Sequence, residues 1–510
     1  MTDEFSMQLN RRALLKGAIA SVVTLPAAAV FAARAGDLKA VKQAVDAGFE
    51  SSVRRIQEWI GLPTIAAEQL NVDQGADYMV QLAHDAGFRR VRKVATGGNP
   101  AVFGVLDAGA KHTVGLYFMY DVKQYDAKEW TSPPLEARIF DHPLGRAIRG
   151  RGAVNHKGPE GTFLAMLHAF HAAGVTPPVN LVLLAEGEEE IGSPNLINAL
   201  KDPEVLAEMQ RADAFFMPTP LQGANGEVAI SLGAKGLIEC ELISSGERWG
   251  RGPARDMHSG GKAAVDSPVW HLIEALSTLV RDGGNTPAID GWFERYRPLT
   301  ASQRTLIAQL ASKSSEAEAM EASGVKRWIN DISWSESIER QASQPTVNIE
   351  GLVAGYIGPG GKTILPARAT AKLDLRIVPD MTFADCLSKL RTHLAKRGFG
   401  DIEIKVTGGY DPTETAADSG LVLAEQAVLA RLGLSHTLIP RISGSYPGYV
   451  FTGLPLRKPF NQFGVGTGGR AHAPDEYYLI ESNTPKVAGL REAAKAHAEF
   501  LYEMASGKKS

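Results

Sequence analysis

The pattern that most constrains this chain is the alternation, from Gly36 onward, of short apolar runs with amphipathic segments. Such alternation is typical of an α/β protein whose strands form a sheet covered by helices. Runs 111–120, 180–185 and 214–217 are predicted to be buried strands, and 161–173 a helix that ends at a glycine. Polar residues follow two of these strands, and open α/β sheets form their ligand crevices at strand carboxyl ends. We therefore expect a functional site there.

A second unit is predicted to begin near residue 233. Runs 237–242, 346–353 and 369–378 are expected to be strands, while Ser267 before Pro268, and Thr382, give start signals for two helices. Two strand-helix units predict a small α+β domain inserted into the first. A final amphipathic helix is expected over 484–504, and 284–344 is expected to be helical.

The N-terminus resembles a twin-arginine export signal. Asn10-Arg-Arg-Ala-Leu-Leu-Lys16 precedes an apolar stretch over 17–33 and a small-x-small cleavage site at Ala33-Arg-Ala35. We expect cleavage after Ala35 and a periplasmic or secreted protein without stable membrane insertion. The alternative is an N-terminal anchor, although the apolar stretch is shorter than the ~20 residues of a spanning helix. The predicted units are 1–35 (signal peptide), 36–232 and 410–510 (catalytic domain), and 233–409 (lid).

Composition limits the classes of partner. The 510 residues are 44% hydrophobic and 22% charged, with a formal net charge of -3 and no basic block, so neither nucleic acid nor an anionic membrane is expected as a partner. Cys240 and Cys386 are the only cysteines, and we expect two buried thiols rather than a disulfide.

Several short blocks carry polar residues at spacings typical of a known family. They are Met119-Tyr-Asp-Val122, Trp130–Leu135, Gly150–Gly158, Glu186–Ser193, Asp256–Gly260, Lys362–Ala367 and Ala471–Glu476. In this order they resemble the zinc exopeptidase and amidohydrolase family of carnosinase, aminoacylase, carboxypeptidase G and succinyl-diaminopimelate desuccinylase, from about Val41 to Ala498. The resemblance implies a phosphorylase/hydrolase-like mixed-sheet α/β catalytic domain, an inserted ferredoxin-like α+β lid and dimerisation domain, and a homodimer.

The metal positions implied by the resemblance are only partly kept. The family binds two zinc ions, and its first site falls on Met119, Asn155 and Thr219 in place of a histidine and two aspartates. A thioether, an amide and a hydroxyl are weak ligands for zinc. Glu190 and His472 match the second site, with Asn155 as its weakened third ligand. We expect zinc or another divalent metal at no more than one tightly bound ion per chain; the alternative is a polar pocket without metal, and His156 is a further candidate donor.

The resemblance also implies roles in catalysis and substrate binding. Glu189 matches the general base, and His258 matches a lid histidine that stabilises the oxyanion in a neighbouring subunit's site. Arg376 matches the guanidinium that binds the substrate carboxylate. The substrate-binding loop matches Ser443, Gly444 and Ser445.

The expected function is hydrolysis of a small peptide or N-acyl amino acid that bears a free carboxylate. Two alternatives stay open: a catalytically silent member that binds a peptide-like ligand, and an enzyme that performs metal-independent chemistry in the same pocket. The altered residues Met119, Asn155 and Thr219 favour the alternatives, whereas Glu189, Glu190 and His472 favour continued hydrolysis.

Overall fold

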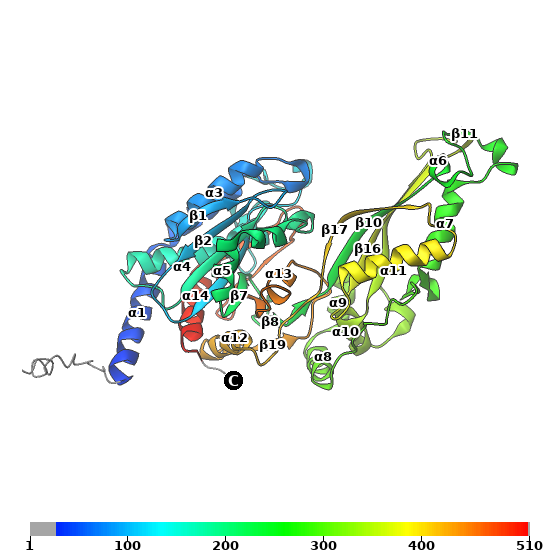
Figure 1. Ribbon diagram of the computed structural model, residues 1–510. Coiled ribbons are helices and arrows are strands. Elements are labelled where there is room, and N and C mark those ends of the chain that lie inside the picture. Colours follow the sequence, from blue (N-terminus) through cyan, green and yellow to red (C-terminus); the bar gives the residue numbers. More distant parts are fainter. Residues whose placement is uncertain (1–26, 508–510) are drawn as a thin grey trace, which may run out of the picture.

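The computed structural model describes residues 27–507. The chain forms two bodies, one around a central sheet and one around a smaller sheet (Figure 1). The predicted export motif at 10–16 lies outside the described residues, and the predicted cleavage after Ala35 falls within helix α1 (Ala27–Ala47). Among the described helices, none combines the length and the apolar character that a membrane span requires.

The central sheet is mixed, as predicted. Its strand order is β1-β2-β6-β3-β7-β20, in which β6, β3, β7 and β20 are parallel and the β1 and β2 edge is antiparallel. The strands are β1 (Arg89–Val94), β2 (Ala101–Leu106), β3 (Thr113–Met119), β6 (Asn180–Glu186), β7 (Ala214–Pro218) and β20 (Phe460–Phe463). Every residue of β3 and β6 is buried, which explains their continuous apolar sequences.

Helices cover both faces of this sheet. On one face the predicted helix is present as α4 (Gly158–Ala172), and Phe163 packs there against Phe118, Phe216 and His497. The helices of this body are α1, α2 (Phe49–Ile60), α3 (Val72–Asp85), α4, α5 (Pro203–Arg211), α12 (Gly420–Arg431), α13 (Tyr449–Thr452) and α14 (Leu490–Ala505). The last helix was expected from residue 484, but Pro485 and Gly489 delay its start, and the Glu492 carboxylate accepts from the Gly489 N–H at 3.1 Å.

A small antiparallel sheet brings two distant blocks together. In the order β21-β22-β5-β4, β5 pairs with β22 so that Arg149 lies opposite Tyr477. Segments 150–155 and 471–476 therefore lie side by side. The strands are β4 (Arg138–His142), β5 (Gly145–Arg149), β21 (Gly468–Gly469) and β22 (Tyr477–Ser482).

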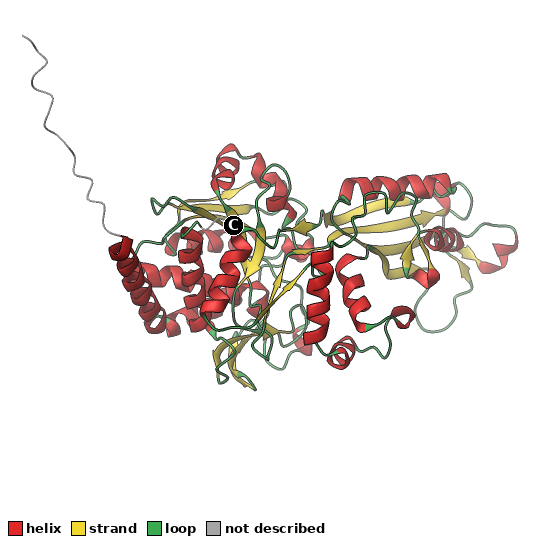
Figure 2. Cartoon of the chain, turned by 90° about the horizontal axis from the view of Figure 1, so that it is seen from below, coloured by secondary structure: helices red, strands yellow, loops and turns green. Residues whose placement is uncertain are grey.

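The lid is an antiparallel four-stranded sheet with two helices on one face (Figure 2). Its order is β14-β16-β10-β17, built from β10 (Gly236–Ser245), β14 (Thr346–Ala354), β16 (Arg368–Ile377) and β17 (Glu403–Tyr410). Helices α7 (Pro268–Thr278) and α11 (Phe383–Lys396) begin as predicted, with Ser267 and Thr382 as side-chain caps. Cys240 and Cys386 are both buried and unpaired in its core, as expected.

The stretch over 284–344, which was expected to be helical, contains three helices. They are α8 (Ala301–Lys313), α9 (Glu316–Ser323) and α10 (Trp334–Ser343), and α8 contacts strand β19 (His436–Ile439) of the larger body. Shorter elements complete the chain: α6 (Gly246–Trp249), β8 (Val228–Ser231), β9 (Gly233–Ala234), β11 (Met257–His258), β12 (Val280–Arg281), β13 (Thr286–Pro287), β15 (Ile364–Leu365) and β18 (Thr413–Glu414).

Candidate active site

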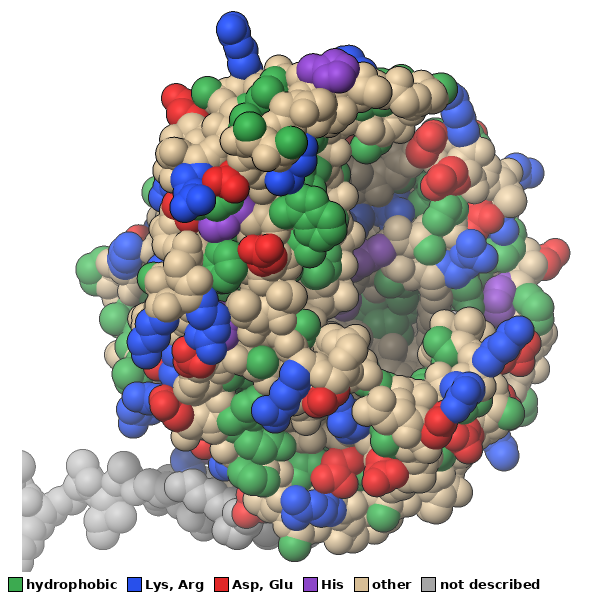
Figure 3. Space-filling view, turned by 90° about the vertical axis from the view of Figure 1, so that its right-hand side faces the viewer, with side chains coloured by type: hydrophobic (Ala, Val, Ile, Leu, Met, Phe, Trp, Pro, Cys, Tyr) green, Lys and Arg blue, Asp and Glu red, His purple; other side chains and the backbone are tan. Residues whose placement is uncertain are grey.

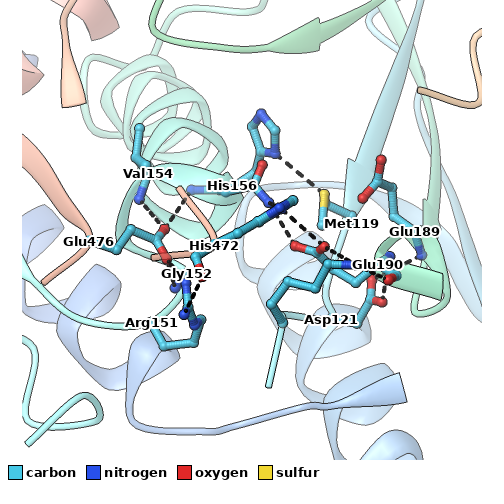
Figure 4. A network of polar contacts seen from close by, with 12 residues as sticks. Met119, Asp121, Arg151, Gly152, Val154, His156, Glu189, Glu190, His472 and Glu476 are labelled. Atoms are coloured by element: carbon cyan, nitrogen blue, oxygen red, sulfur yellow. Dashed lines mark hydrogen bonds and ion pairs between the residues drawn. The ribbon is translucent and has the colours of Figure 1, made fainter. Parts of the chain in front are cut away.

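The site lies where β3 and β6 end side by side. Met119 and Glu186 are register partners on these two strands, and the loops beyond them carry the polar residues. Asp121 accepts hydrogen bonds from the backbone N–H groups of Glu189 and Glu190, at 3.2 and 3.0 Å (Figure 4). Asp121 therefore fixes the backbone of the acidic segment after β6, although Met119 offers no imidazole for it to orient.

A buried carboxylate positions the segment that carries Asn155. Glu476 accepts from the backbone N–H groups of Gly152, Val154 and Asn155 at 3.1, 2.9 and 2.9 Å, and pairs with Arg151 Nη1 at 2.7 Å (Figure 4). The Arg151 and Glu476 side chains are 3% and 1% exposed. Charge-assisted hydrogen bonds in such a setting hold the backbone firmly.

Three predicted metal ligands meet, and they bond to one another. Asn155 Nδ2 donates to Glu190 Oε1 at 2.6 Å and lies 3.0 Å from His472 Nε2. His472 Nε2 also lies 3.2 Å from Glu190 Oε2. Lys123, which sequence reasoning did not single out, places its Nζ 3.4 Å from Glu190 Oε2 and donates to the Glu190 carbonyl. Its only sequence signal is a long basic side chain two residues after Asp121.

Two of the first-site positions, Met119 and Thr219, make other contacts. Met119 Sδ lies 3.3 Å from His156 Nδ1, and burial lowers the pKa of His156 to about 4, so its imidazole is neutral at pH 7 (Figure 4). Thr219 follows β7 and donates its hydroxyl to the Met217 carbonyl at 3.2 Å.

Glu189 is the free carboxyl of the site. Its side chain makes no hydrogen bond or ion pair with any described residue, and it points away from Asp121 (Figure 4). Burial, together with the charges of Glu190 and Asp121, raises the pKa of Glu189 well above its ordinary value. A carboxyl of this kind keeps its proton at higher pH and suits proton exchange with a reacting group.

Arg376 joins the lid to the larger body. Its Nε and Nη2 donate to Asp374 at 2.9 and 2.8 Å, and its Nη1 donates to Ser445 Oγ at 2.8 Å. The second hydrogen of each Nη remains available for a ligand. Ser443 and Gly444 are exposed beside it, and the Gly444 carbonyl accepts from the Lys235 N–H at 3.2 Å. Figure 3 shows a deep hollow whose interior carries basic and histidine side chains.

His258 is not part of this cluster within one chain. It lies exposed on β11, which Figure 1 shows at the end of the lid remote from the central sheet. Its Nδ1 accepts from the Gly260 N–H at 3.0 Å.

Comparison with known proteins decides the family. The model of Peptidase family M20/M25/M40 matches residues 116–502. The chain belongs to that family. Among M20 relatives, the Cys-Gly metallodipeptidase DUG1 of Saccharomyces cerevisiae is 26% identical over 374 residues, covering 70% of this chain and 75% of DUG1. The human Beta-Ala-His dipeptidase is 24% identical over 430 residues, covering 79% and 81%. The M20 metallo-carboxypeptidase Sso-CP2 from Sulfolobus solfataricus has a TM-score of 0.79 at 31% identity, covering 89% of this chain and 99% of that one.

M20 peptidases depend on metal ions, typically two zinc ions, and the donor set of this chain does not fit such a pair. The described residues contain no group of three or more His, Cys, Asp or Glu side chains arranged to hold a metal. Where a bridging carboxylate would be needed, the Asn155 amide directs its N–H₂ group toward Glu190 and His472. The positive end of an amide N–H₂ group repels a cation. The other Glu190 oxygen, Oε2, is paired with the Lys123 ammonium at 3.4 Å.

Proposed function

We propose that this M20 family member acts on a small peptide or N-acyl amino acid that it recognises by a free carboxylate. Arg376 carries the proposal, since it keeps a free hydrogen on each Nη and is tied by Ser445 to the larger body. The neighbouring loop of Ser443 and Gly444 offers further polar groups to the same ligand. Relatives named as dipeptidases and as a carboxypeptidase support hydrolysis of an amide bond.

Binding and proton exchange are assigned to different residues of the site. Arg376 binds and orients the carboxylate end of the ligand, and Glu189 exchanges a proton with the group at the bond to be broken. We propose no more than one tightly bound divalent ion per chain, and any such ion would have to be held by Glu190, His472 and the Asn155 oxygen, the matched donors that remain.

The replaced metal ligands favour a second candidate function, in which the protein does not use a pair of metal ions for hydrolysis. Met119, Asn155 and Thr219 remove the first metal site, so a silent member that binds a peptide-like ligand, or an enzyme with metal-independent chemistry, would keep the same carboxylate recognition. A panel of carboxylate-bearing dipeptides, with Glu189→Gln as the reference, separates these candidates. Turnover that Glu189→Gln abolishes supports hydrolysis, and binding without turnover supports the silent form.

We also propose export by the twin-arginine route and a homodimer formed through the lid. The lid has an edge strand, β14, with exposed Ile349, Leu352 and Val353, and Trp270 on α7 is 60% exposed. Exposed apolar side chains beside an unpaired strand edge favour association with a second copy.

The test compares a dipeptide with its carboxamide analogue by calorimetry. Arg376→Met should weaken binding of the acid by roughly tenfold to a hundredfold, because a charge-assisted bond is worth about 1.5–3 kcal/mol and each ~1.4 kcal/mol is tenfold. Binding of the carboxamide should change little. Arg368→Met, at an exposed position on the same strand, is the matched control. Equal losses for acid and amide would show that Arg376 serves only the fold.

A further inference from the structure

Glu190 is almost removed from water and needs a positive partner. Its side chain is 4% exposed, and a buried carboxylate is costly unless a cation or several donors compensate it. The centre of the site therefore requires a cation from some source.

Lys123 supplies one. Its ammonium lies 3.4 Å from Glu190 Oε2 and also donates to the Glu190 carbonyl, so it is anchored to the residue at two points. Apart from His472, no other basic side chain among the described residues pairs with Glu190. The Lys123 side chain is 34% exposed, which places it at the mouth of the site rather than in the core.

The remaining donors are also engaged. Asn155 donates to Glu190 Oε1 at 2.6 Å and lies 3.0 Å from His472 Nε2, so the two side chains that match metal ligands are bridged by an amide. A divalent ion approaching Glu190 and His472 would meet this N–H₂ group and the Lys123 ammonium. Like charges at such distances repel strongly wherever water is partly excluded.

We propose that Lys123 is a built-in cation that neutralises Glu190 in the place where M20 relatives hold a metal ion, and that it thereby keeps a divalent ion out. Lys123 is thus a positioning residue for Glu190. The inference rests on the proposed assignment of Glu190 and His472 as the remaining ligand positions. It is independent of the carboxylate ligand, so the Arg376 calorimetry can fail without affecting it.

The test is a zinc titration by calorimetry near pH 7 on the full-length protein, after purification and removal of bound metal. Lys123→Gln should bind zinc at least ~10-fold more tightly than the native protein, because it removes a like charge beside the ion. Adding Glu190→Gln should abolish that gain. Two control variants should behave as the native protein does: Lys128→Gln, which changes an exposed lysine of the same loop, and Lys123→Arg, which keeps the charge.

A double-mutant cycle that combines Asn155→Asp with Lys123→Gln provides a second test of the same proposal. Asn155→Asp restores a carboxylate ligand, and it should increase zinc affinity more in the Lys123→Gln background than in the native background. Zinc binding by Lys123→Gln no tighter than by Lys128→Gln would overturn the proposal. So would tight zinc binding by the native protein that Glu190→Gln removes, a result that decides the matter even if Lys123→Gln fails to fold.

Discussion

At the scale of single residues, the site departs from its family through side chains that keep their place and change their chemistry. Asn155 stands where a bridging carboxylate is implied, and it donates one hydrogen bond to Glu190 and lies close to His472. The sequence predicted that these three residues belong together, and the structure brings them together. The sequence did not predict the role of Lys123. A single lysine in a loop belongs to no recognisable spacing pattern, and its partner Glu190 lies 67 residues away.

Glu186 should make the stability of the protein depend on pH. The hydroxyls of Tyr117 and Ser193 donate to its Oε1 at 2.6 and 2.8 Å, and burial raises the pKa of Glu186 to about 8. An unfolded glutamate titrates near ~4.3, so the folded protein keeps a proton that the unfolded chain releases. This contribution to stability is complete below the unfolded pKa and is lost as the pH rises toward 8.

Glu186→Gln should therefore flatten the decline of the free energy of unfolding over this range, by at most ~1.4 kcal/mol per pH unit. Urea denaturation at a series of pH values measures it. The exposed Glu58→Gln is the control and should follow the native profile. A decline equally steep in Glu186→Gln would show that another group is responsible.

At the scale of elements, the central sheet and the small antiparallel sheet place the site together. The pairing of β5 with β22 sets Glu476 beside segment 152–155. The Glu476 carboxylate accepts hydrogen bonds from three backbone N–H groups of this segment. The sequence predicted β3, β6 and β7 from their apolar runs, because buried strands leave a strong pattern, and it predicted three of the four lid strands, β10, β14 and β16, but not β17. It did not predict the two-residue strand β21 or the role of Glu476, since these depend on tertiary pairing.

Glu476→Gln should destabilise the fold strongly. The change leaves Arg151, whose side chain is 3% exposed, as a buried charge without its partner, and loss of one partner from a buried pair costs about 3–5 kcal/mol. Glu481→Gln, on strand β22 that follows Glu476 directly, is the matched control. Its pairs with Arg146 and Arg491 are partly exposed, so its loss should cost less than about 1 kcal/mol. Equal midpoints for the two variants in denaturant would contradict this account of Glu476.

At the scale of the whole molecule, we propose that His258 completes the site of a second chain in the homodimer. Figure 1 shows β11, the strand that carries His258, at the far end of the lid from the central sheet. The sequence could predict a shared site only through the family resemblance, because no pattern within one chain reveals which residues a partner supplies.

Mixing two inactive chains tests the shared site. If His258 acts across the dimer, His258→Ala mixed with Glu189→Gln should recover part of any hydrolytic activity, since one site in the mixed dimer keeps both native residues. Dimers formed separately from each variant are the controls. A confirmed mixed dimer with no more activity than these parents would exclude a shared site.

The most direct test of the altered metal centre is the number of metal ions per chain. Protein incubated with excess zinc and then desalted should retain no more than one tightly bound ion per chain in elemental analysis, because Met119, Asn155 and Thr219 remove the first site and Lys123 opposes the second. Two tightly held ions per chain would contradict the account and require ligands other than those described.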